Sequence, residues 1–280
     1  MGVVNLTPDS FSDGGRYLKA EDAIARARAL IADGADMLDI GAESTRPGAG
    51  PVAAAEEWDR LSPVVAAIRA ESAIPISVDT MKSEVARAAV AAGATMWNDV
   101  TALRWSDQSV PLAAELGCDV VLMHMQGEPR TMQAAPAYQD VVGEVSAFLI
   151  ERAEAAMAAG VARGKIWLDP GIGFGKTGQH SLTLLGHMDR IVALGFPVLL
   201  GASRKSFLGK VDRRATGAAD RLGGSLAAAL AGAAAGVAAV RVHDVRETVQ
   251  ALAVAAAIKG ASSEPSPHEA GRGQGEGTFA

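Results

Sequence analysis

The feature that most constrains this chain is an alternation that repeats along almost its whole length. A short run rich in β-branched residues is followed by a turn and then by an alanine-rich segment of helical period. Short apolar runs of this kind are typical of buried parallel strands, and the segments between them are long enough for crossover helices. Eight such units fit into about 260 residues. The pattern therefore predicts an α/β fold, a single-domain (β/α)8 TIM barrel over residues 1–260.

The alternation also predicts where each element lies. The expected strands are Gly2–Leu6, Met37–Gly41, Ile74–Asp79, Met96–Val100, Val120–His124, Ile166–Asp169, Pro197–Gly201 and Val240–His243. The expected helices are Ala20–Asp33, Ala54–Glu71, Ser83–Ala92, Val110–Leu116, Asp140–Ala159, Ser181–Leu194, Asp220–Ala235 and Val245–Lys259. Glycine is common just after a helix, and it stands there at Gly34, Gly93, Gly117, Gly160, Gly195 and Gly236. An open, doubly wound sheet is the structural alternative, but its polar residues would gather at one switch point.

Composition limits the compartment and the partners. The net charge of −6 and the pI of about 5.4 favour neither nucleic-acid nor anionic-membrane binding. No apolar run reaches the ~18 residues of a membrane span, the first residues lack a signal-peptide pattern, and Cys118 is the only cysteine. We therefore expect a cytoplasmic protein. Segment 261–280 is rich in Gly, Ser, Pro and Glu, which predicts a disordered C-terminal tail.

Polar residues stand at all eight predicted strand ends, where a barrel of this kind carries its active site. They include Asn5, Glu43, Ser77, Asp79, Asn98, Asp99, His124, Asp169, Ser203, Lys205, Arg241, His243 and Asp244. Asp79, Asn98 and Asp169 would be costly to bury without partners. Together they predict a planar ligand with several N–H donors, such as a pterin. For Asp99, Asp244 and Ser203, capping of the following loop is an equal alternative.

A cationic cluster follows strands seven and eight, where barrel enzymes often bind phosphate. Lys205, Arg241 and His243 form it, and arginine suits bidentate phosphate contacts. The cluster predicts a site for an anionic leaving group. Two polar loops, 7–15 and 42–50, follow strands one and two at the same face, and loops in this position commonly close over substrate.

One segment imitates a nucleotide-binding motif. Gly171 to Thr177 resembles a phosphate-binding P-loop, but its first glycine stands one residue too late for the motif. We interpret it as the loop after strand six. The histidines and the cysteine do not have zinc-site spacing either.

Seven segments carry a resemblance to a known family: Asn5–Gly15, Gly41–Gly48, Ser77–Thr80, Asn98–Val100, Leu168–Phe174, Gly201–Gly209 and Arg241–Val245. In this order they resemble the signature motifs of the dihydropteroate synthases, a family of pterin-binding enzymes. The resemblance covers about residues 2–258. There are two departures. Ala42 stands where the second motif commonly has glycine, and family members usually carry a lead-in segment before the first motif.

The resemblance implies a role for each matching position. The pterin would be bound by Asp79, Asn98, Met123, Asp169, Phe174, Gly201 and Lys205. The diphosphate would be held by Asn5, Arg241 and His243, with Asn5 as the protein ligand of a Mg²⁺ ion. The p-aminobenzoate pocket would be formed by Phe11, Thr45, Arg46, Pro47 and Ser206. The catalytic set would be Asn5, Asp13, Arg46, Lys205, Arg241 and His243.

The family's reaction condenses 6-hydroxymethyl-7,8-dihydropterin diphosphate with p-aminobenzoate in folate biosynthesis, by an SN1-like substitution. Sulfonamides compete for its p-aminobenzoate pocket. The resemblance also implies a homodimer through the apolar helices around 226–240 and 251–258, although such helices could equally pack only on the barrel.

Two other functions remain open as alternatives. A methyltetrahydrofolate-dependent corrinoid methyltransferase needs no diphosphate site, so Arg241 and His243 speak against it. A catalytically silent pterin-binding protein would be expected to lack Asp13, Thr45 or Arg46, and all three are present.

Overall fold

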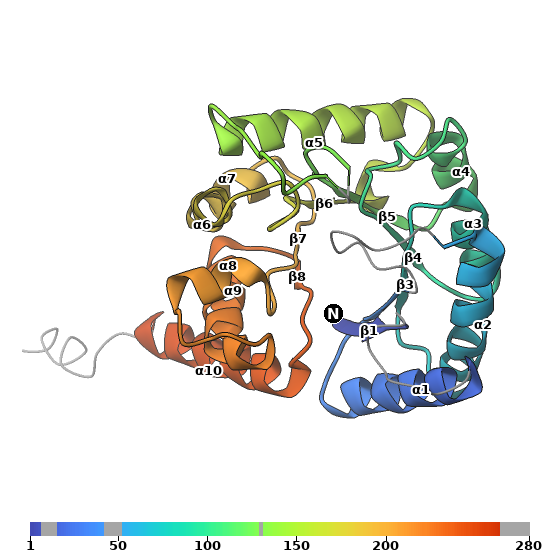
Figure 1. Cartoon of the computed structure of the whole chain (residues 1–280), viewed down its shortest axis with the longest axis horizontal. Coiled ribbons are helices and arrows are strands. Elements are labelled where there is room, and N and C mark those ends of the chain that lie inside the picture. The colour runs from blue at the N-terminus through green and yellow to red at the C-terminus, as the bar shows by residue number, and fades with distance from the viewer. Residues whose placement is uncertain (7–15, 42–51, 129–130, 264–280) are drawn as a thin grey trace, which may run out of the picture.

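Eight parallel strands in the described part of the chain form a ring that is surrounded by helices (Figure 1). The computed structural model describes residues 1–6, 16–41, 52–128 and 131–263. The strands are β1 (Gly2–Asn5), β2 (Leu38–Gly41), β3 (Ile76–Asp79), β4 (Met96–Asp99), β5 (Asp119–Met123), β6 (Ile166–Asp169), β7 (Leu199–Leu200) and β8 (Ala239–Val240). This arrangement confirms the predicted (β/α)8 barrel.

The ring closes through two short contacts. Strands β1 to β6 form one continuous parallel sheet, and β7 pairs with β8. Leu168 bridges to Val198 between β6 and β7, and Gly2 bridges to Val242 between β1 and the end of β8. The second junction is a two-sided exchange, because Val242 N donates to Met1 O at 2.9 Å and Val3 N donates to Val242 O at 3.0 Å. A closed ring leaves no unpaired sheet edge.

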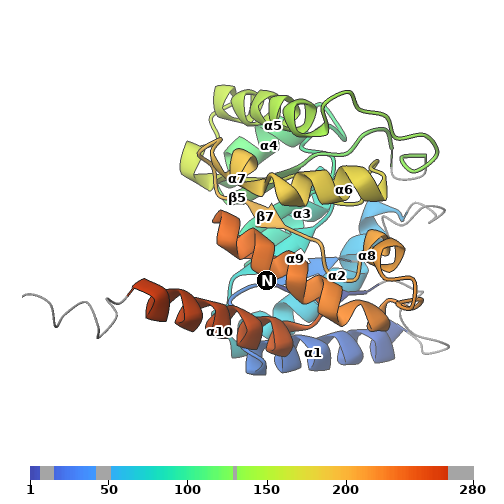
Figure 2. The ribbon, with the colours of Figure 1, turned by 90° about the vertical axis from the view of Figure 1, so that its left-hand side faces the viewer.

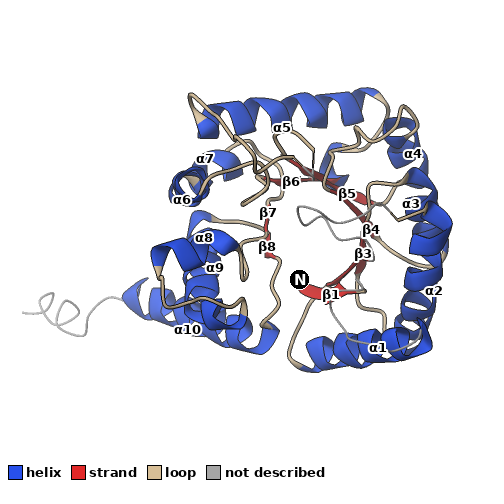
Figure 3. Cartoon of the chain, in the orientation of Figure 1, coloured by secondary structure: helices blue, strands red, loops and turns tan. Residues whose placement is uncertain are grey.

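The helices lie outside the strands (Figure 3). They are α1 (Arg16–Ala32), α2 (Ala54–Glu71), α3 (Ser83–Ala91), α4 (Ser109–Leu116), α5 (Val141–Ala158), α6 (Gly178–Gly186), α7 (Met188–Val192), α8 (Ser206–Val211), α9 (Leu222–Ala235) and α10 (Val245–Ser263), with short 3₁₀ turns η2 (Arg163–Lys165) and η3 (Ala219–Arg221). Figure 2 shows α9 and α10 packed side by side. None of the described helices has the length and apolar character that a membrane span requires.

Several element predictions need correction. The helix expected over Ser181–Leu194 is two helices, α6 and α7, because the backbone of His187 leaves the helical region (φ −125°, ψ 31°). Helix α8 was not predicted. Helix α10 continues to Ser263, three residues into the predicted tail, and residues 264–280 lie outside the described ones. The six predicted helix-ending glycines all have positive φ, as expected.

Strands β7 and β8 are shorter than predicted. Each has two residues, so Arg241 and His243 lie just beyond β8 rather than within it. The backbone nevertheless stays paired, since Arg241 N donates to Leu200 O at 2.9 Å. This hydrogen bond fixes the backbone of Arg241 to the barrel wall, and with it the position of the Cα from which the side chain extends.

The two faces of the strands have different surroundings. Outward residues such as Ile40, Val78 and Leu168 pack under the helices in one large apolar core. Inside the barrel, Met96, Val121 and Leu199 form an apolar layer with Met37, Trp167 and Ala239 packed against it. Since side chains alternate along a strand, the residue two positions after each member of this apolar layer also points into the barrel. These next residues are Asp39, Asn98, Met123, Asp169, Gly201 and Arg241. The fold thus places a mostly polar layer directly above an apolar one.

Candidate functional site

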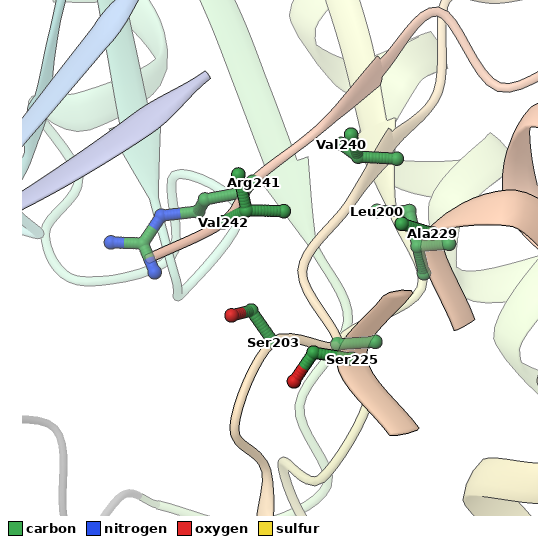
Figure 4. Close-up of a pocket in the computed structure, with 8 residues that line it drawn as sticks. Leu200, Ser203, Ser225, Ala229, Val240, Arg241 and Val242 are labelled. Carbon is green, nitrogen blue, oxygen red and sulfur yellow. The ribbon is translucent and has the colours of Figure 1, made fainter. Parts of the chain in front are cut away.

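An ion-pair cluster crosses the inside of the barrel. Arg241 Nε donates to Oδ2 of Asp39 at 2.6 Å, and its Nη2 donates to Oδ2 of Asp79 at 2.9 Å. Figure 4 shows the guanidinium of Arg241 pointing away from Leu200 and Ala229, which line a crevice between β7, β8 and α9. The arginine that we assigned to an anion site thus also neutralises a carboxylate that we assigned to the pterin.

Asp39 was not among the predicted site residues. It is wholly buried on β2, where its carboxylate also accepts from Ser77 Oγ at 2.6 Å and from Asn98 Nδ2 at 3.3 Å. The sequence indicated that Asp79 and Asn98 would be costly to bury without partners. In the structure both have one: Asp79 binds Arg241, and Asn98 binds Asp39. The signal that could have revealed Asp39 is a lone carboxylate in the apolar run Met37–Gly41, on the inward side of the alternation.

Burial and like charge shift the ionisation of Asp79. Burial, together with the like charge of the nearby Asp39, raises the pKa of this carboxyl to about 7, and Arg241 offsets the increase only in part. Burial also raises the pKa of Asp169, against the hydrogen bond from Gly171 N at 2.7 Å and the attraction of Lys205. Both carboxyls stand in a site where a ligand with N–H donors would favour the ionised form.

Lys205 faces these carboxylates from the loop after β7. Its Nζ lies 4.0 Å from the ring centre of Phe174, a cation–π arrangement. Burial lowers the pKa of Lys205 to about 8, although Asp169 favours the charged form. Beside this pair, Phe174 packs on a methionine-rich cluster formed by Met81, Val100, Met123, Met125 and Met132. Methionine side chains adapt their shape, so the cluster provides an apolar wall for a flat ring.

His243 is held by a serine. Ser203 Oγ accepts from His243 N at 3.2 Å and lies 3.1 Å from His243 Nδ1. Burial, together with Arg241, lowers the pKa of His243 to about 4, so the imidazole is neutral at pH 7. When the Ser203 hydroxyl donates to Nδ1, the neutral ring carries its proton on Nε2, from which it can be donated to an anion.

Three further predicted residues lie at this face. Asn5 ends β1 and is exposed, and Ser206 is the exposed first residue of α8. A side chain at Gly201 would lie 3.8 Å from Arg241 Cδ and 3.9 Å from Asp169 Oδ2. The missing side chain at this position keeps open the space between these two groups.

Three polar residues at the strand ends have structural roles. Asp99 accepts from Thr101 N and Leu103 N at 2.7 and 2.9 Å, which is loop capping. Asp244 pairs with Arg204 through Nε at 3.0 Å. His124 is buried and turned toward Lys176, whose Nζ lies 2.8 Å from its Nδ1.

Lys176, the lysine of the segment that resembles a P-loop, has a structural role. Its Nζ also donates to Phe174 O at 3.0 Å and to His124 O at 3.3 Å, which ties the loop after β6 to the loop after β5. Burial lowers the pKa of Lys176 to about 7. The lysine thus supports the backbone of both loops.

Five predicted residues lie outside the described ones. They belong to segments 7–15 and 42–51, which follow β1 and β2 in the chain: Phe11, Asp13, Thr45, Arg46 and Pro47. Of the predicted p-aminobenzoate pocket, Ser206 is thus the one member that the structure describes.

Comparison with known proteins decides the family. A family model described as "Pterin binding enzyme" matches residues 1–243. The chain belongs to this family of pterin-binding enzymes. Its similarity to dihydropteroate synthase of Neisseria meningitidis serogroup C is 49% identity over 255 residues, covering 90% of this chain and 89% of the relative. With dihydropteroate synthase of Escherichia coli K12 it shares 46% identity over 254 residues, covering 91% and 89%. The expected resemblance is confirmed.

Solved structures agree with this assignment. Dihydropteroate synthase of Xanthomonas albilineans with 4-aminobenzoic acid superimposes with a TM-score of 0.87 at 48% identity, covering 95% of this chain and 93% of that one. The Yersinia pestis enzyme in a sulfonamide drug complex gives a TM-score of 0.87 at 41% identity, covering 93% and 94%. A further Xanthomonas albilineans structure of this pterin-binding family contains 7,8-dihydropteroate, with 46% identity and a TM-score of 0.84.

Proposed function

We propose that this chain joins 6-hydroxymethyl-7,8-dihydropterin diphosphate to p-aminobenzoate, forming 7,8-dihydropteroate and diphosphate. The observation that carries the proposal is the arrangement inside the barrel. Carboxylates and an amide suited to pterin N–H groups stand beside an apolar methionine and phenylalanine wall, and Arg241 and His243 stand next to them. Relatives that share 46–49% identity with this chain are named dihydropteroate synthase, which agrees with this reaction.

The residues divide the work between the two halves of the pterin substrate. Asp79, Asn98 and Asp169 accept from the N–H groups of the ring, and Lys205 donates to its oxygen. Met123 and Phe174 pack against the ring face. Because these groups hold the ring in place, the methyl carbon is presented to the second substrate in a fixed orientation.

Departure of diphosphate is the step that needs electrostatic help. The C–O bond of the pterin methyl group breaks, and the charge that develops on the leaving oxygen is stabilised by Arg241 and by the Nε2–H of neutral His243. The carboxylates stabilise the pterin cation that remains, and the amine of p-aminobenzoate then attacks the methyl carbon and loses one N–H proton to give 7,8-dihydropteroate. Ser206 would line the pocket for this second substrate, together with the loop residues Phe11, Thr45, Arg46 and Pro47; Asp13 would face the reacting carbon.

A magnesium ion is proposed as the cofactor, with Asn5 as its protein ligand. The fit can be judged from the donor set. No group of three or more His, Cys, Asp or Glu in the described residues could hold a metal, whereas Asn5 presents an exposed amide at the end of β1. Mg²⁺ commonly uses one or two protein oxygens and takes the rest from water and substrate phosphate. When bound, it would neutralise negative charge on the diphosphate.

One assay tests the function. The purified protein is incubated with the dihydropterin diphosphate, p-aminobenzoate and Mg²⁺, and both dihydropteroate and released diphosphate are quantified. Equal amounts of the two products are expected. A reaction without p-aminobenzoate is the control, since diphosphate released there measures hydrolysis. A folded sample that yields no dihydropteroate would show that the proposal is wrong.

We further propose a cytoplasmic homodimer. Two observations support it: Cys118 is a buried free thiol, as suits a reducing compartment, and α10 carries the exposed apolar residues Val249, Val254 and Ile258. Sedimentation analysis of the purified protein tests the dimer.

A further inference from the structure

Arg241 lies between two carboxylates of different character. Asp39 is completely buried, whereas the side chain of Asp79 is 21% exposed. One guanidinium cannot neutralise two carboxylates fully. When a ligand enters the barrel, Arg241 can therefore lose one of these two partners, Asp39 or Asp79.

Asp39 has the contacts of a permanent partner. Besides Arg241, it is bonded to Ser77 Oγ at 2.6 Å and to Asn98 Nδ2 at 3.3 Å. Ser77 lies opposite Asp39 in the register of β2 and β3, so this contact is fixed by the sheet itself. With no access to water, Asp39 cannot exchange its arginine for solvent without leaving a buried charge unpaired.

Asp79 has the contacts of an exchangeable partner. It lies at the end of β3, nearer the mouth of the barrel, and it receives Nη2 of Arg241 at 2.9 Å. In the proposed function the pterin donates N–H groups to this same carboxylate. The pterin ring and Arg241 thus compete for Asp79. Arg241 can release Asp79 without becoming an unpaired charge only if a second carboxylate still binds it.

We propose that Asp39 is a positioning residue of this site. Its ion pair holds Arg241 at the inner wall of the barrel, so that Arg241 can release Asp79 to the pterin while its guanidinium stays oriented toward the leaving group. This inference rests on the proposed function. Asp39 touches neither substrate and acts through Arg241. Without its charge, Arg241 would have Asp79 as its main partner, and pterin binding would have to break that pair.

A double-mutant cycle tests the anchoring. Asp39→Asn keeps the shape of the side chain and removes its charge. We expect kcat/KM for the dihydropterin diphosphate to fall about thirtyfold or more, with the KM for p-aminobenzoate within about twofold of the original. In the Arg241→Ala background, the same substitution should change kcat/KM by less than about threefold, because the two residues act as one unit. Losses that multiply independently would overturn the proposal.

A milder variant guards against misfolding of Asp39→Asn. Ser77→Ala removes one hydrogen bond from Asp39 and leaves its charge. We expect kcat/KM to fall about three- to tenfold, and this effect also disappears in the Arg241→Ala background. The matched control is Ser181→Ala, which likewise removes a wholly buried hydroxyl, bonded to Thr177 O at 3.0 Å in α6, far from the cluster. Its kcat/KM should stay within about twofold. Equal losses in both serine variants would contradict the proposal.

Stability provides a readout that needs no substrate. Arg241→Ala leaves Asp39 buried without its cation, so its melting temperature should fall. Adding Asp39→Asn removes the unpaired charge and should raise the melting temperature above that of Arg241→Ala alone. A further decrease would mean that Asp39 does not depend on Arg241. If the unmodified protein made no dihydropteroate, the proposed function would be wrong. The melting temperatures of Arg241→Ala and of the double variant would still show whether Asp39 and Arg241 depend on each other.

Discussion

At the scale of single residues, the ionisation of Asp79 predicts how pterin binding depends on pH. Its pKa is raised to about 7, and only the ionised carboxylate accepts N–H donors on both oxygens. As pH falls through about 7, Asp79 takes up a proton, so the affinity for a dihydropterin without diphosphate should decrease. Lys205, with a pKa lowered to about 8, should weaken binding again as pH rises through that value.

Calorimetric titration between pH 5.5 and 9 checks this prediction, with the highest affinity expected at about pH 7 to 8. Asp79→Asn serves as the control, since it should bind weakly and lose the acid limb. An affinity that is constant across the range would contradict the assignment of Asp79 to the pterin.

A second residue-scale prediction concerns Ser203. Its hydroxyl holds both N and Nδ1 of His243, at 3.2 and 3.1 Å. Ser203→Ala should therefore leave the ring free to turn and to change tautomer, and kcat should fall about tenfold while the KM for p-aminobenzoate stays nearly constant. Steady-state kinetics measure both values. Ser146→Ala in α5, which removes a hydroxyl bonded to Val142 O at 2.7 Å, should leave kcat unchanged. A similar kcat decrease in both variants would rule out a specific role for Ser203.

Sequence reasoning places single residues well and their partners poorly. Alternation along the strands assigns Asn98 and Asp169 to the inside of the barrel, and the structure has them there, two positions after Met96 and Trp167. It does not reveal that Arg241 reaches Asp39, 202 positions away in the chain. Such a pairing depends on closure of the barrel, which brings β8 next to β1 and within reach of β2.

At the scale of elements, the loop after β6 depends on glycine. Gly171 has φ +64°, and a Cβ at this position would lie 1.9 Å from His124 O, a backbone atom that cannot move aside. Gly171→Ala should therefore lower the free energy of unfolding by about 3 kcal/mol or more, or prevent folding. Chemical denaturation measures the change.

Gly186→Ala is the matched control for this prediction. Gly186 ends α6, and a Cβ there meets no other atom within 4 Å. The substitution should be neutral or stabilise the protein by up to about 1 kcal/mol. If both variants were equally stable, the close approach of the β5 and β6 loops would not be the reason for glycine at 171.

Element boundaries were predictable where local signals exist. The bounds of α2 (Ala54–Glu71) agree with the prediction, and each expected glycine ends its helix with positive φ. The break between α6 and α7 was missed because their apolar positions continue through His187 without a change of period. Helix α8 was missed because a helix of six residues is too short to establish a period.

At the scale of the whole molecule, the count of eight units predicted a closed barrel, and the structure confirms it. The lengths of β7 and β8 could not be predicted, because they depend on how the last quarter of the ring meets the first. In the described part of this last quarter, only Leu199–Leu200 and Ala239–Val240 form a regular ladder, and isolated bridges at Val198 and Val242 complete the closure. Pairing between distant segments is set by the closed geometry rather than by local propensity.

The last prediction is that two copies of the chain associate through α9 and α10. Beyond Thr248, no described residue of α10 whose side chain is placed is fully buried, although this stretch is rich in alanine and carries Val254 and Ile258, which are 54% and 66% exposed. An apolar helix face that packs only partly on its own barrel is better explained by a second copy than by solvent. We therefore expect sedimentation velocity to detect a dimer, and Val254→Glu with Ile258→Glu to yield a folded monomer, because dimerisation would bury these charges unpaired. Leu182→Glu, on the exposed side of α6, is the control and should remain dimeric. A wild-type protein that stays monomeric at micromolar concentration would mean that α10 has no such partner.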